Sequence, residues 1–267
     1  MIPAATRYAR ATDVDHALEL LEEPDAKAIA GGQSLIPVMK LRIARPSVVV
    51  DISRLDLRGV SERDGELHIG ALTTWRELVE SDTVGRSGLA AIAESAAGIG
   101  DLQVRNLGTV GGSIAHADPA SDMTAVLLAL EARLRLRSPD GERELPLADV
   151  LVGPFTTAIA PGELVIEVVV PLPPPASGSA YASVEHPASG FALVGAAALV
   201  APARETVALT GVGATPFVLA VGDPSAAIAA AEIYGDRFAS VEYRRELAAV
   251  LVARALRTAR ARAEEKT

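Results

Sequence analysis

Helical periodicity and β-branched runs alternate along this chain of 267 residues, which predicts an α+β fold. Two glycine-rich segments, AGGQSL from residue 30 and TVGGS from residue 109, each follow an apolar stretch and precede an expected helix. Backbone N–H groups at such junctions are free to bind an anion, and glycine lets the chain approach it closely. Two such loops in one chain indicate a dinucleotide that is held from two sides.

The composition excludes several classes of protein. A hydrophobic content of 49% is enough for one or two buried cores, and a net charge of −9 gives no basic surface for nucleic acid. No apolar segment approaches the roughly 20 residues of a membrane span, and the N-terminus lacks the apolar core of a signal peptide, so we expect a cytoplasmic protein. Because the chain has no cysteine, it cannot ligate an iron–sulfur cluster through thiolates, and any electrons that pass through it need an organic cofactor.

The first expected unit covers residues 1–54. A helix that starts near Thr12 and a short buried strand over 26–30 lead into the first glycine segment. Ser34 is placed to cap the next helix, and the β-branched run over 48–52 predicts a further strand.

The second expected unit covers residues 55–172. Its turn and capping signals predict hairpins at 64–65 and 140–141 and helices at 74–79, 87–97 and 123–132. Residues 99–118 show little periodicity and predict a long loop, which is usually functional in a compact domain.

A proline-rich run over residues 171–175 predicts a linker and therefore a third unit over residues 173–267. Its expected strands lie at 179–185, 191–200 and 207–212, and its expected helices at 225–232 and 243–262.

Known nucleotide motifs and metal sites do not match this sequence. The glycine segments fit neither GxGxxG nor GxxxxGK[ST], so a nucleotide-binding fold other than the Rossmann or P-loop type is expected. The histidines lack metal-ligand spacing, so we predict no metal site.

His16 and His68 are interpreted as a surface and a strand residue, whereas His116, inside the second glycine segment, is either structural or in contact with a cofactor. No acid, base or nucleophile can be assigned as catalytic.

Longer stretches around the glycine segments carry a family resemblance. They read AGGQSLIPVMKLRIARPSVVVDIS, LHIGALTT and GDLQVRNLGTVGGSIAHADPASDM, followed downstream by GSAYASVEHPASGFALVGAAA and EYRRELAAVLVARAL. In this order, over nearly the whole chain, they resemble the FAD-binding medium subunit of molybdenum hydroxylases, the carbon monoxide dehydrogenase and xanthine dehydrogenase group. The resemblance implies a fold of the vanillyl-alcohol-oxidase type, in which two α+β subdomains clasp FAD, followed by a C-terminal α+β flavoprotein domain.

The same resemblance implies a set of cofactor-binding residues. The two glycine loops would hold the FAD diphosphate, Asp122 would accept hydrogen bonds from hydroxyl or N–H groups of FAD, and Phe191 would stack on the flavin or gate it. Alternatively, Asp122 is only a helix N-terminal carboxylate and Phe191 only a core strand residue. Where relatives often carry a basic residue before the last apolar strand, His186 is the only possible cation. The full expected set is Ala30, Gly31, Gly32, Gln33, Ser34, Leu35, Thr109, Val110, Gly111, Gly112, Ser113, His116, Asp122 and Phe191.

The function implied by the resemblance is electron transfer. FAD would receive electrons from the [2Fe–2S] clusters of a small subunit and deliver them to NAD, oxygen or quinone. A large subunit would bind molybdopterin, and the three subunits would form a dimer of heterotrimers. Residues 100–106 are expected to face the iron–sulfur subunit. Two alternatives remain: a stand-alone flavin-dependent reductase of the same fold, and a flavin-less assembly subunit that keeps the fold as a scaffold.

Overall fold

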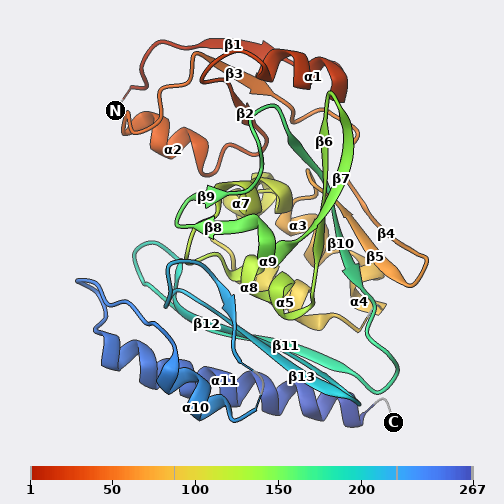
Figure 1. Cartoon of the computed structure of the whole chain (residues 1–267), viewed down its shortest axis with the longest axis vertical. Helices are drawn as coiled ribbons and strands as arrows, with labels where there is room; N and C mark the ends of the chain where they lie inside the picture. Colours follow the sequence, from red (N-terminus) through yellow and green to blue (C-terminus); the bar gives the residue numbers. More distant parts are fainter. Residues whose placement is uncertain (1, 87, 221, 266–267) are drawn as a thin grey trace.

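The computed structural model describes residues 2–86, 88–220 and 222–265. Within these residues the chain forms sheets of three, five, four and two strands. Figure 1 shows the three larger sheets in sequence order along the long axis of the molecule, from the N-terminal unit at the top to the C-terminal unit at the bottom. The mixture of helices and strands confirms the expected α+β class.

The N-terminal unit is a parallel sheet in the order β1-β3-β2, accompanied by two helices. Its elements are β1 (Arg7–Arg10), α1 (Val14–Leu21), β2 (Lys27–Ile29), α2 (Leu35–Lys40) and β3 (Val48–Asp51). The central strand β3 is buried along its length and packs against Ala17 and Leu18 of α1. The helix cap is Asp13, which accepts the His16 N–H, rather than Thr12. Strand β2 is only partly buried, contrary to expectation, because it borders the cleft described below.

The middle unit is an antiparallel sheet in the order β4-β5-β10-β6-β7, with helices against one face. The strands are β4 (Val60–Arg63), β5 (Glu66–Gly70), β6 (Arg133–Ser138), β7 (Gly141–Pro146) and β10 (Leu164–Pro171); β8 (Leu151–Gly153) pairs with β9 (Thr156–Thr157) beside it. Both expected hairpins are present, β4–β5 and β6–β7. The predicted capping box is also confirmed, since Thr74 and Glu77 hydrogen-bond reciprocally at the start of a helix.

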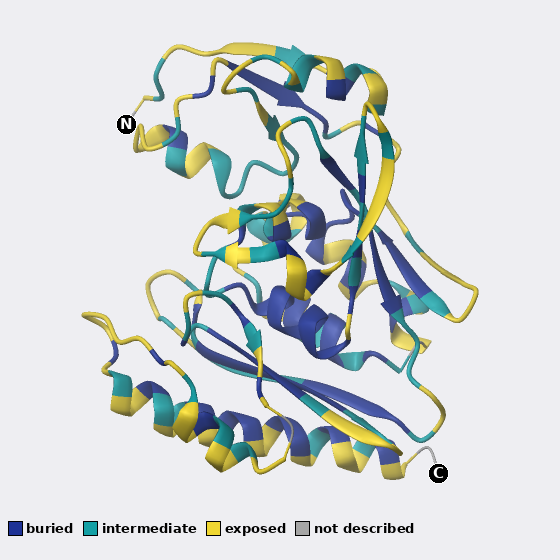
Figure 2. Ribbon diagram, viewed as in Figure 1, coloured by how far each residue is buried: buried dark blue, intermediate teal, exposed yellow. Residues whose placement is uncertain are grey.

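The helices of the middle unit correct the expected long loop. They are α3 (Trp75–Val79), α4 (Asp82–Arg86), α5 (Ala90–Gly98), α6 (Leu102–Leu107), α7 (Val110–His116), α8 (Asp122–Ala129) and α9 (Leu147–Val150). Helices α6 and α7 occupy most of residues 99–118, capped by Asp101 and Thr109. Helix α8 is buried along its length (Figure 2) and begins after a Ser121 cap, one residue before the expected start at 123. The expected helix start at residue 87 lies outside the described residues.

The C-terminal unit is an antiparallel sheet between two helical layers. Its elements are β11 (Gly178–Glu185), β12 (Ala192–Ala201), β13 (Arg204–Thr210), β14 (Phe217–Val218), α10 (Pro224–Ala230) and α11 (Val241–Glu264). Side chains of β12 alternate between two cores: Ala197 and Leu199 join the core of the middle unit, whereas Ala196 and Ala198 pack with α11. A strand buried on both faces explains the unbroken apolar run that the sequence shows here.

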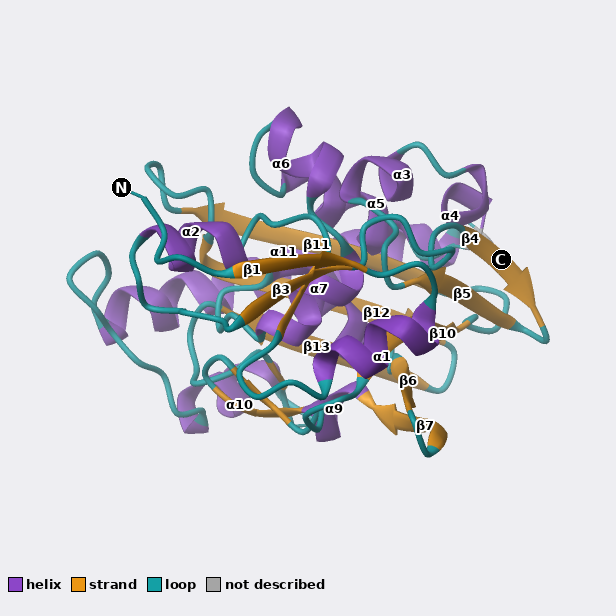
Figure 3. Cartoon of the chain, turned by 90° about the horizontal axis from the view of Figure 1, so that it is seen from above, coloured by secondary structure: helices purple, strands orange, loops and turns teal. Residues whose placement is uncertain are grey.

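Helix α6 lies at the periphery beside α3, which Figure 3 shows from above. Its side chains Leu102 and Leu107 are exposed by 69% and 53%. Among the helices described, none is both long and apolar enough to cross a membrane.

Candidate functional site

A cleft of about 840 Å³ lies between the N-terminal and middle units, a volume typical of cofactor sites. Both glycine segments line it, together with His116, Asp122 and, from the loop before β12, Phe191. Of the expected site residues, Val110 alone does not line the cleft, because its side chain is buried in the core of the middle unit.

Close backbone approach brings the two glycine segments together. An ideal Cβ atom built on Gly31 would lie 1.7 Å from the carbonyl oxygen of Leu107, at the end of α6. One built on Gly112 would lie 3.9 Å from the Cβ of Ala30. The first segment therefore sits directly against the chain that leads into the second, which requires glycine at position 31.

The first glycine segment offers unused hydrogen-bond donors to the cleft. Within the described residues, the backbone N–H groups of Gly32, Gln33 and Ser34 form no hydrogen bond. The Ser34 side chain, expected to cap α2, makes no capping hydrogen bond. Free N–H groups and a free hydroxyl in a glycine turn form a concave surface that suits a phosphate group.

The second segment differs, because its backbone donors after Thr109 are already satisfied. The N–H groups of Val110 and Gly111 donate to the carbonyls of Thr73 and Ala71, and that of Gly112 donates to the Thr109 hydroxyl. An added Cβ on Gly111 would meet Ala71 at 2.7 Å. This segment is therefore a close-packed wall of the cleft, in which the N–H groups of residues 110–113 are not free to bind an anion.

Asp122 occupies a buried position that joins the cleft to the C-terminal unit. It is the first residue of α8, and its Oδ1 accepts a hydrogen bond from the Tyr181 hydroxyl of β11. Burial raises the pKa of Asp122 to about 6; hydrogen bonds from Tyr181 and from its own backbone N–H oppose this rise, and the negative charges of Glu185 and Asp118 add to it. Tyr181 lies 59 residues away, and no local pattern in the sequence marks it.

Aromatic side chains stand at the mouth of the cleft. Phe191 is 47% exposed, so it is not the core strand residue of the alternative interpretation. The ring of His116 lies 5.2 Å from that of Phe155, another cleft residue that the sequence analysis missed. Phe155 has a left-handed backbone (φ 53°) and follows a proline, features that predict a turn but not a binding role.

Charge in the cleft comes mainly from carboxylates. Lys27 is the one Lys or Arg among the described residues that line it, whereas Asp118 and Asp122 lie on the middle-unit side. An anionic ligand here would therefore be held chiefly by the N–H groups of the first glycine segment.

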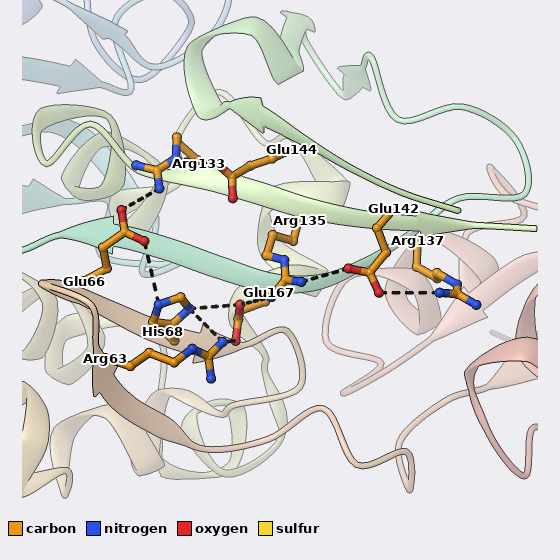
Figure 4. Close-up of polar contacts among 9 residues, drawn as sticks. All are labelled: Arg63, Glu66, His68, Arg133, Arg135, Arg137, Glu142, Glu144 and Glu167. Atoms are coloured by element: carbon orange, nitrogen blue, oxygen red, sulfur yellow. Dashed lines mark hydrogen bonds and ion pairs between the residues drawn. The ribbon is translucent and has the colours of Figure 1, made fainter. Parts of the chain in front are cut away.

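His68 belongs to a separate cluster on the outer face of the five-stranded sheet (Figure 4). Its Nδ1 lies 3.0 Å from Glu167 Oε2, and Arg135 and Arg63 also bind that carboxylate. The remaining members of the cluster are Glu66, Arg133, Arg137, Glu142 and Glu144. Oppositely charged side chains that pair across neighbouring strands stabilise a sheet. His68 therefore has a structural role, as expected for a strand histidine. Across the residues described, no group of acidic and histidine side chains could hold a metal ion.

The cleft lies between two α+β units and is lined by two glycine segments, of which the first has free N–H groups. This arrangement is that of a dinucleotide-binding protein outside the Rossmann and P-loop classes. Residues 4–173 match the family model described as the FAD binding domain in molybdopterin dehydrogenase. The chain therefore belongs to the family of FAD-binding medium subunits of molybdenum hydroxylases, and FAD is its cofactor.

Individual relatives agree over most or all of the chain. The carbon monoxide dehydrogenase medium chain of Afipia carboxidovorans is 35% identical, with 99% of this chain and 100% of the relative covered. The 6-hydroxypseudooxynicotine dehydrogenase complex subunit alpha of Paenarthrobacter nicotinovorans is 44% identical over 75% of this chain and 68% of the relative. A chain of the reconstituted CO dehydrogenase from Oligotropha carboxidovorans superposes with a TM-score of 0.92 at 34% identity, covering 98% of this chain and all of that one.

Proposed function

We propose that this chain is the electron-transfer subunit of a molybdenum-containing hydroxylase, and that it relays electrons from the [2Fe–2S] clusters of a partner subunit to an external acceptor. The observation that carries the proposal is the match to a medium chain over its full length. The absence of cysteine supports it, because the chain must obtain electrons from clusters that another subunit ligates.

The residues of the cleft fit FAD. Gly32, Gln33 and Ser34 would bind the diphosphate through their free N–H groups, and Gly31 lets this segment pack against the Leu107 carbonyl at the end of α6. Asp122 would accept a hydrogen bond from a cofactor hydroxyl or N–H group, and Phe191 would cover the flavin. When bound, the flavin supplies redox chemistry in steps of one or two electrons, which no side chain of this protein provides.

We retain the three-domain division at residues 1–54, 55–172 and 173–267 as part of the proposal. The three larger sheets fall within these ranges, and the cleft lies between the first two.

Helix α6 is the proposed contact with the iron–sulfur subunit, in a dimer of heterotrimers that also contains a molybdopterin-binding large subunit. Its Leu102 and Leu107 are exposed, and Gly100 and Val104 beside them line the cleft. Leu102→Asp should release the iron–sulfur subunit while FAD stays bound, and Val250→Asp on the exposed face of α11 is the matched control. Arg105 is unsuitable for this test, because it donates to the Ile99 and Gly100 carbonyls and holds its own loop.

The decisive experiment is purification of the tagged full chain from its native cell, with analysis of flavin, iron and molybdenum. One FAD per chain, with partners that bring both metals, is expected. A yellow chain without partners that is reduced directly by NADPH would favour the stand-alone reductase. A colourless preparation that releases no flavin on denaturation would favour the scaffold subunit and would refute the proposal.

A further inference from the structure

Helix α8 starts at a junction of the cleft with the C-terminal unit. Ser121 Oγ lies 3.2 Å from Ser113 Oγ in the second glycine segment, and the next residue, Asp122, lines the cleft. Just upstream, the carbonyl of Pro119 accepts hydrogen bonds from Thr210 Oγ1 and the Gly211 N–H. The C-terminal unit therefore holds this short segment from behind.

Tyr181 supplies a second side-chain bond from the C-terminal unit at this junction. Its hydroxyl donates to Asp122, but the residue itself does not line the cleft. The neighbouring strand β12 leaves space for this hydroxyl at Gly195, where an ideal Cβ would lie 2.1 Å from the hydroxyl oxygen. A glycine in a strand weakens the strand and often marks a close approach, which here is that of the phenol.

We propose that Tyr181 is a positioning residue, through which the C-terminal unit holds the Asp122 carboxylate toward FAD as a hydrogen-bond acceptor. The proposal rests on the proposed role of Asp122 in binding the cofactor. It assigns the C-terminal unit a function in cofactor affinity through a residue that does not touch the cleft.

Few charged groups act on Asp122. Asp118 and Glu185 are both carboxyls that raise its pKa, and His116 at the end of α7 lines the same cleft. Strand β12, which packs on α8, contains no ionisable residue. The ionisable groups of α5, β13 and α9, which also pack on α8, are Glu94, Arg204, Glu205 and Asp149; the first three pair with Arg262, Glu131 and Arg260.

The test is the pH dependence of the FAD dissociation constant, measured by flavin fluorescence for the full chain in the assembly in which it is purified. Because ionisation makes the carboxyl a stronger acceptor, wild-type affinity should rise with pH around 6 and be about tenfold weaker at pH 5 than at pH 8. Tyr181→Phe removes a bond that favours the ionised form, so the midpoint should move to higher pH, with roughly fivefold weaker binding at pH 6 and near-normal binding at pH 8.

Two further variants make the result specific. Asp122→Asn should bind FAD weakly with no pH step near 6. Tyr234→Phe removes a similar phenol–carboxylate bond, to Glu232, away from the cleft and should match wild type. A step that persists in Asp122→Asn, an unchanged midpoint in Tyr181→Phe, or wild-type affinity that falls as pH rises overturns the inference. Failure of wild type to bind FAD at any pH would instead refute the proposed function.

Discussion

Substitution of Gly31 by alanine tests how the cleft is built. The added Cβ would lie 1.7 Å from the Leu107 carbonyl oxygen, whereas Cβ atoms essentially never approach another heavy atom within 3.0 Å. The first glycine segment must therefore move away from the end of α6 by roughly 1.3 Å, because the obstacle is backbone and cannot rotate aside.

A displacement of this size misaligns the N–H groups that would bind the diphosphate. Overpacking costs about 1–3 kcal/mol of free energy. In enzymes, a 1 Å misplacement of positioned groups can lower the reaction rate about a hundredfold. We expect FAD affinity to fall between about tenfold and a hundredfold, measured by equilibrium titration of the apoprotein.

The matched control is Gly85→Ala. Gly85 is exposed in α4, and a Cβ there meets nothing within 4 Å, so this variant should bind FAD normally and gain about 0.5–1 kcal/mol of stability. If Gly31→Ala bound FAD as tightly as Gly85→Ala, the close approach of the two segments would not be what shapes the site.

Three further predictions concern stability. Burial raises the pKa of Glu167, but hydrogen bonds from His68 and Arg135 outweigh it and hold the pKa below the ordinary 4.5. Its ionised form therefore stabilises the fold above that pH, and the contribution disappears as the pH falls through the lowered pKa. Glu167→Gln should cost about 1 kcal/mol in urea unfolding at pH 7 and progressively less as the pH falls below 4.5; a loss that does not shrink in acid would contradict this. Arg244 is buried and donates to the Leu193 and Gly211 carbonyls and to Asp236, so Arg244→Met should lower the unfolding free energy by about 3 kcal/mol, and an unchanged melting temperature would refute its role. Thr74→Ala removes one half of the capping box and should cost about 1 kcal/mol in the same melts, with exposed Thr156→Ala as a neutral control.

Local signals in the sequence predicted the elements that depend on local chemistry. The hairpin at Asp64 and Gly65 and the capping box at Thr74 need only neighbouring residues, and both are where they were expected. Strand β1 (Arg7–Arg10) was missed because it is a mostly exposed edge strand with no alternation of apolar residues. Helix α7 was missed because glycines in its first turn indicate a loop, whereas close packing against Ala71 requires the first of them, Gly111.

The candidate site shows the same contrast between local and tertiary signals. The first glycine segment could be identified from its own residues. In the second segment, N–H groups are occupied by the carbonyls of Ala71 and Thr73, which sequence spacing does not place nearby. The bond from Tyr181 to Asp122 joins two units of the fold, so only the tertiary structure reveals it.

The position of β10 sets an order of events during synthesis. This strand lies at the centre of the five-stranded sheet, between β5 and β6, yet it is the last of the five in the chain. The hairpins β4–β5 and β6–β7 can form as they leave the ribosome, but they stay separate until residues 164–171 insert between them. Because Leu164 and Val165 also line the cleft, the nascent chain cannot capture its cofactor before nearly two thirds of it has been made.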